Sequence, residues 1–194
     1  IEIYNKDSKK FVINSLLPKD WRILSYTSLE GNTGTRVEHT LKEVIVNEIE
    51  ARNEGWQYLL SVLHEVGHAV IYESSEFQKN LYHTGDRLAE KLSAFPDDVE
   101  VRKRMESRYS KIERDAWAWA IRNFRSILNM LGIDQADIFS SNQELRDYAN
   151  DCLLSYKEGG RAWVERNRWF LEEDRSNLLE YISKLYTTKG NKNE

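Results

Sequence analysis

Apolar residues follow three different patterns along this chain of 194 residues. Within residues 1–50 they form short runs rich in β-branched and aromatic side chains, at 11–13, 21–27 and 37–49, which is typical of strands. Two glycines within residues 30–35 separate the second run from the third and indicate a turn. The pattern therefore predicts a hairpin that joins 21–27 to 37–49.

The second pattern, from Trp56 to Ile71, is apolar around much of a helical circumference. A helix of this kind is buried rather than half-exposed. Gly67 lowers the helix propensity of this segment, which indicates that another part of the chain passes close to its backbone at that point. We therefore expect a central helix that is covered on several sides.

The third pattern is a long amphipathic helix that begins after the acidic cap at 97–100 and ends at Gly132. Before it, residues 73–96 hold only a possible short helix at 87–93, so this segment is expected to be a connection, a wall of a cleft or a lid. After it, residues 135–187 predict two or more helices.

These elements predict an α+β fold. A small antiparallel or mixed N-terminal sheet would pack on the helix around Gly67, followed by the long helix and a helical C-terminal part. We expect a core of residues 1–132 and a C-terminal helical subdomain of residues 133–194 that packs on it.

The central helix carries a chemically specific motif, His64-Glu65-Val66-Gly67-His68. Residues four apart lie on one face of a helix, so His64 and His68 can reach the same metal ion, with Glu65 beside them. Two neutral imidazoles, a third protein ligand and a water position are what a catalytic zinc ion requires. The motif therefore predicts one Zn²⁺ ion, with Glu65 as the general base of a peptidase.

Composition narrows the class of protein. A net charge of −4 argues against a nucleic-acid partner, for which a basic excess is expected. The single cysteine, Cys152, allows no internal disulfide and favours a reducing compartment. No membrane span or signal segment is visible, so we expect a cytoplasmic protein without a membrane partner.

A third metal ligand must come from outside the motif. A histidine six residues after His68 would indicate a metzincin, but position 74 is a serine. Glu113 has the best context because it borders the buried stripe of the long helix, where a carboxylate is costly unless paired or metal-bound. His83 is either an exposed loop histidine or a donor to the transition state. The full set of candidate ligands is His83, Asp86, Glu90, Glu106 and Glu113.

A resemblance adds to this interpretation. The segment Glu113-Arg114-Asp115-Ala116-Trp117-Ala118-Trp119-Ala120, downstream of the His-Glu-x-Gly-His helix, resembles zincin peptidases of the gluzincin type and is most similar to the ImmA/IrrE group. The resemblance covers roughly residues 54–125. It implies His64, His68 and Glu113 as zinc ligands and Glu65 as general base.

The strand before the central helix is a candidate for holding the substrate. A strand at the edge of a sheet can pair with an extended peptide, and we assign this role to the region of Val44, Val46 and Glu48. An interior strand without a free edge is the alternative.

The expected function is zinc-dependent hydrolysis of protein or peptide substrates. Two other interpretations remain: a zinc-bearing protein-interaction module with latent or absent activity, and a zinc-free helical interaction domain in which the motif is accidental.

Overall fold

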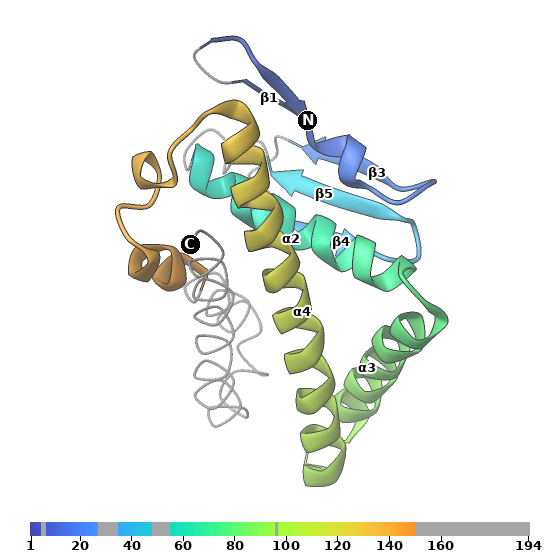
Figure 1. Ribbon diagram of the computed structural model, residues 1–194. Coiled ribbons are helices and arrows are strands. Elements are labelled where there is room, and N and C mark those ends of the chain that lie inside the picture. Colours follow the sequence, from blue (N-terminus) through green and yellow to red (C-terminus); the bar gives the residue numbers. More distant parts are fainter. Residues whose placement is uncertain (5–6, 27–34, 48–54, 96, 150–194) are drawn as a thin grey trace. The chain divides into compact units, whose positions relative to one another are not determined.

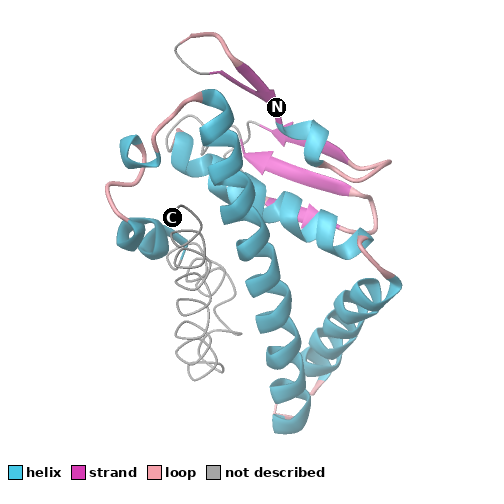
Figure 2. Ribbon diagram, viewed as in Figure 1, coloured by secondary structure: helices cyan, strands magenta, loops and turns pink. Residues whose placement is uncertain are grey.

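The computed structural model describes residues 1–4, 7–26, 35–47, 55–95 and 97–149. The chain divides into two compact units, Ile1–Ile133 and Asp134–Glu194. The described residues have an α+β fold that is mostly helical and contains two small sheets (Figures 1 and 2). No helix among them combines the length and the apolar character needed to cross a membrane.

Both sheets belong to the first unit. Strands β1 (Glu2–Tyr4) and β2 (Lys10–Val12) form an antiparallel pair, followed by the 3₁₀ turn η1 (Ile13–Leu16). The second sheet has three strands in the order β3-β5-β4. Their bounds are Arg22–Tyr26 for β3, Arg36–Glu38 for β4 and Glu43–Asn47 for β5.

The predicted hairpin between 21–27 and 37–49 is wrong. β3 and β5 are parallel, and the hairpin instead lies within the third apolar run, where β4 and β5 pair in antiparallel register. This run is interrupted by a turn in which the Lys42 backbone N–H donates to the His39 carbonyl at 3.3 Å and Lys42 has a φ of 55°. A local turn therefore divides the apolar run at 37–49, which the sequence pattern presents as one strand, into two strands.

The described residues of this unit also form three helices, α2 (Trp56–Glu73), α3 (Glu76–Ala94) and α4 (Val99–Leu131). α2 is packed between the three-stranded sheet and α4, while α3 runs back along the first half of α4 (Figure 1). This placement confirms that α2 is a buried helix: of its 18 residues, 12 are buried. Its apolar circumference is explained by neighbours on two opposite sides.

Helix α4 forms as its pattern predicts, over 33 residues. The Asp98 carboxylate accepts from the Val101 backbone N–H at 2.9 Å, and Gly132 ends the helix in the left-handed conformation. Its buried stripe includes Val101, Met105, Ile112, Ala116, Trp117, Ala120, Phe124, Ile127 and Leu131.

Helix α3 is much longer than the short helix predicted at 87–93. It begins after Ser75, whose side chain accepts from the Gln78 backbone N–H, and it continues for 19 residues. Leu81, Gly85, Leu88 and Leu92 form its buried stripe, at spacings of four, three and four. Gly85 weakens this periodic signal in the sequence, because a glycine does not register as an apolar position.

In the second unit the described residues hold the 3₁₀ turn η2 (Gln135–Asp137) and helical residues 142–149. Phe139, Leu145 and Ala149 are buried, and the Phe139 and Tyr148 rings lie 5.5 Å apart. The predicted helix around 161–186 and Cys152 lie outside the described residues.

Glu73 joins several elements at the C-terminal end of α2. Its carboxylate accepts from the Trp21 indole N–H at 3.1 Å and pairs with Lys79 at 2.9 Å and Lys42 at 3.4 Å. Hydrogen bonds from Lys79 and Trp21 lower the pKa of Glu73 to about 2, below the ordinary glutamate value of 4.5. The charged form is therefore the one that stabilises the fold.

We expect Glu73→Gln to lower the free energy of unfolding by about 1–3 kcal/mol at pH 7, because it removes the acceptor charge from three donors. The wild-type advantage is fully present above pH 4.5 and is lost as the pH falls toward 2. Urea unfolding at several pH values measures both effects. Glu76→Gln is the matched control, since Glu76 also pairs with Lys79 but is 85% exposed; an equal loss in both variants would contradict the assignment.

We expect Gly67→Ala to destabilise the fold by about 1–3 kcal/mol through overpacking, although alanine is the better helix former. A Cβ at this position would lie 2.9 Å from the Ala116 carbonyl oxygen and 3.2 Å from the Trp119 ring. Gly85→Ala is the control: its Cβ would meet neighbours only at 3.7 Å and beyond, so a gain of about 0.5–1 kcal/mol is expected. The free energy of unfolding of both variants, measured in the presence of a chelator, tests these expectations. A Gly67→Ala protein more stable than the wild type would refute the close approach.

Candidate metal centre

Three side chains from two helices meet at one point. The His64 and His68 Nε2 atoms lie 3.0 Å apart, and the Glu113 carboxylate approaches them at 3.0 Å and 3.4 Å respectively. Within the described part of the chain this is the one group of three or more His, Cys, Asp or Glu residues arranged to hold a metal ion. The candidate ligand that the long helix was expected to supply therefore does lie beside the two histidines.

The crossing of α2 and α4 delivers Glu113 to this point. His64 and His68 are one turn apart on α2, and Gly67 contacts the Ala116 backbone of α4. Ala116 is three residues after Glu113, so this close contact between the two helices is about one turn from the carboxylate. Because Gly67 has no side chain, α4 can approach α2 closely enough for Glu113 to reach the imidazoles. The close approach of another segment that the sequence predicts at this glycine is therefore confirmed.

The donor set fits a zinc ion. Ligand atoms about 2.1 Å from a tetrahedral zinc lie roughly 3.4 Å from one another. Here the two Nε2 atoms are 3.0 Å apart, the His64 Nε2 is 3.0 Å from the Glu113 Oε2, and the His68 Nε2 is 3.4 Å from the Glu113 Oε1. The imidazoles are 2% and 6% exposed and the Glu113 side chain is 28% exposed. Of the three side chains, that of Glu113 is therefore the most exposed.

Glu113 and the imidazoles stabilise one another's charged forms. Burial favours the neutral forms, but Glu113 outweighs this effect at His68 and raises the pKa of that imidazole. In turn the imidazoles, His68 foremost, outweigh burial at Glu113 and lower the pKa of the carboxyl group. A cation bound here would replace protons on these atoms, so metal binding would release protons.

Aromatic residues surround both histidines. The Trp117 indole of α4 stacks on the His64 ring with centroids 4.4 Å apart and an angle of 26° between planes. The Tyr82 hydroxyl of α3 lies 3.0 Å from the His68 Nδ1. Neither contact was foreseen from the sequence, because aromatic residues at helical spacing are equally typical of an ordinary core.

His39 follows β4 directly and belongs to the same aromatic cluster. Its ring lies 4.7 Å from the Tyr72 ring and 4.7 Å from the Tyr82 ring. Burial, followed by the proximity of His68 and His83, lowers the pKa of His39 to about 3. This histidine is therefore neutral near pH 7, and its contacts link the end of β4 to the metal centre.

Glu65 lies beside the three candidate ligands. Its side chain is buried and its Oε1 atom is 3.9 Å from the His64 Nε2. His83 is an exposed residue of α3, not of a loop, and its Nε2 is 3.0 Å from the Tyr72 hydroxyl.

The remaining candidate ligands do not join the three-residue group. Asp86 receives a hydrogen bond from the Tyr109 hydroxyl at 3.4 Å, and Glu90 is exposed on α3. Glu106 is fully buried on α4. Glu113 is thus the only one of the candidate third ligands that the structure places beside both motif histidines.

The expectation of a free strand edge at Val44 and Val46 is wrong. β5 is the central strand, paired with β3 on one side and β4 on the other, and both valines are buried. Their short apolar run is that of an interior strand. Glu48 lies outside the described residues. Among the described strands of this sheet, the edges belong to β3 and β4.

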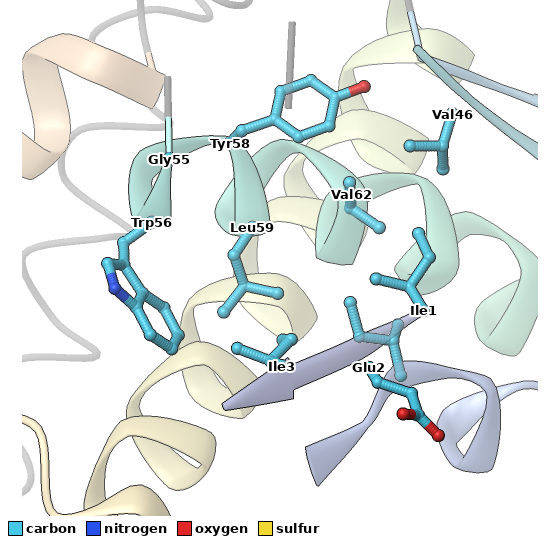
Figure 3. A pocket seen from close by; sticks show the side chains of 10 residues that line it. Ile1, Glu2, Ile3, Val46, Gly55, Trp56, Tyr58, Leu59 and Val62 are labelled. Carbon is cyan, nitrogen blue, oxygen red and sulfur yellow. The ribbon is translucent and has the colours of Figure 1, made fainter. Parts of the chain in front are cut away.

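A cavity of about 320 Å³ lies beside the first turns of α2. Its lining is mostly apolar and includes Ile1, Ile3, Trp56, Leu59 and Val62, as Figure 3 shows. None of the three candidate ligands, nor Glu65, contributes to it. This cavity is therefore separate from the metal centre.

Comparisons with known proteins add no family to this geometry. No protein-family profile, curated protein or solved structure matches the chain. The interpretation of the centre therefore depends on its own residues and distances.

We expect the purified, untagged protein to bind one zinc ion and Glu113→Gln to bind it at least tenfold more weakly, because a charged ligand becomes a neutral amide. Titration against a chromophoric chelator measures the affinity. Glu90→Gln, which removes the same charge from an exposed position, should leave the affinity unchanged. Equal affinities of the wild type and Glu113→Gln would exclude Glu113 as a ligand.

Proposed function

We propose that this protein is a zinc-dependent metallopeptidase in which His64, His68 and Glu113 hold the ion and Glu65 is the general base. The observation that carries the proposal is the convergence of two imidazoles and a carboxylate from separate helices, with a second carboxylate beside them. A purely structural zinc site would use a fourth protein ligand. Within the described residues the group contains three.

The chemistry divides between the ion and the chain. A zinc ion held by these three residues supplies an acidified water molecule and a positive charge beside the substrate carbonyl oxygen. Glu65 accepts the proton of the water that attacks the carbonyl carbon, and then delivers it to the leaving amine nitrogen. The burial of Glu65 shields this transfer from bulk solvent.

We further infer that the protein belongs with the zincins of the gluzincin type, and within them lies nearest to the ImmA/IrrE group. Support comes from the two motifs, His64-Glu65-Val66-Gly67-His68 and the segment that begins at Glu113, which lie together at the crossing of α2 and α4. The substrate of such an enzyme is a protein or peptide.

The edge strand β4 is the best candidate to hold the substrate backbone. Its pairing with β5 occupies one side, and none of the described strands pairs with the other. β4 leads into His39, whose ring contacts Tyr82, and Tyr82 bonds to the ligand His68. An extended peptide added to this edge would therefore run toward the metal centre.

We expect Glu65→Gln to keep its zinc and to lose about 10²–10⁴-fold in the rate of peptide hydrolysis, because an amide cannot accept the proton. A library of peptides analysed by mass spectrometry after incubation with each zinc-loaded protein measures the cleavage. The control is Glu76→Gln, an equivalent change at an exposed site of α3, which should cleave like the wild type.

The outcome also separates this function from its rival. A wild type that binds zinc but cleaves no more than Glu65→Gln would be a zinc-bearing interaction module rather than a peptidase.

A further inference from the structure

The Tyr82 hydroxyl contacts two atoms of the same residue. It lies 3.0 Å from the His68 Nδ1 and 3.4 Å from the His68 backbone carbonyl oxygen. A carbonyl oxygen can only accept, so when the phenol donates to it the phenol oxygen can accept from Nδ1–H. Both contacts are made together only when the proton of a neutral His68 ring is on Nδ1 and the lone pair is on Nε2.

The direction of that lone pair matters because Nε2 is the atom that faces the other two candidate ligands. It lies 3.0 Å from the His64 Nε2 and 3.4 Å from the Glu113 Oε1. The hydroxyl on one side of the ring and the ligand group on the other therefore select the same tautomer.

The Tyr82 ring is itself held in place from two sides. His39 packs against it with ring centroids 4.7 Å apart at 63°, and Tyr72 with centroids 5.5 Å apart at 86°. The side chain is only 5% exposed, so it has little space in which to rotate. The hydroxyl is therefore presented to His68 by a packed cluster rather than by a mobile surface residue.

We propose that Tyr82 is a positioning residue of the metal centre, which fixes the His68 ring with Nε2 directed at the ion. The proposal rests on the proposed metal site, and it gives α3, a helix that supplies no ligand, a defined part in that site. Hydrogen-bonded partners of metal-binding histidines contribute about 10–100-fold to metal affinity.

Two matched variants test the proposal through zinc affinity, measured by chelator competition without reference to catalysis. Tyr82→Phe keeps the ring and removes the hydroxyl, and we expect its zinc dissociation constant to rise about 10–100-fold. Tyr72→Phe makes the same chemical change in the same cluster, but its hydroxyl bonds to the exposed His83 instead. Tyr72→Phe should bind zinc like the wild type, and equal affinities of Tyr82→Phe and the wild type would overturn the proposal.

A second measurement requires no variant and so does not depend on how Tyr82→Phe folds. Long-range ¹H–¹⁵N spectra of the ¹⁵N-labelled, zinc-loaded wild type should show His68 coordinated through Nε2, with an Nδ1–H proton protected from exchange with solvent. Coordination through Nδ1, or an Nδ1–H that exchanges as fast as an exposed imidazole proton, would overturn the proposal.

The same experiments keep this proposal separate from the proposed function. A wild type without zinc affinity overturns both. A wild type that binds zinc and cleaves peptides, together with a Tyr82→Phe protein of equal zinc affinity, overturns only the positioning role.

Discussion

The close approach of α2 and α4 at Gly67 is the constraint on which the rest of the structure depends. A Cβ at this position would lie only 2.9 Å from the Ala116 carbonyl oxygen and 3.2 Å from the Trp119 ring. Because the two helices meet at this depth, Glu113 lies within 3.0 Å of one imidazole and 3.4 Å of the other. The sheet and α3 then cover the faces of α2 that α4 leaves open.

Polar groups inside such a packed layer are costly unless each finds a partner. Two histidines and two glutamates lie on or beside the most buried part of α2. The cost of burying these four side chains is offset mainly by their contacts with one another. Tyr82 contributes a hydroxyl to His68, and Trp117 contributes a flat apolar face to His64. A divalent cation would complete this arrangement, since it would balance the carboxylate charge. It would also bind the imidazole and carboxylate lone pairs that otherwise bind protons.

Several features were predictable because they depend on neighbours in the sequence. The helical period places His64 and His68 on one face, and the apolar circumference of the surrounding segment predicts its burial. Gly67 indicates the close approach of another segment, and a position beside the buried stripe of α4 favours Glu113 among the five candidate third ligands. The acidic cap and Gly132 marked the two ends of that helix.

Other features were decided only by the tertiary structure. The parallel pairing of β3 with β5, and hence the interior position of Val44 and Val46, depends on contacts between segments that no local pattern encodes. The same holds for His39 and Tyr82, which come from a strand end and a helix and are brought beside the candidate metal centre by packing. The sequence by itself determined which residues can bind a metal and on which helices they lie, because spacing along a helix is local. The tertiary structure decided which carboxylate reaches them and which aromatic groups hold them, because those depend on how separate elements cross.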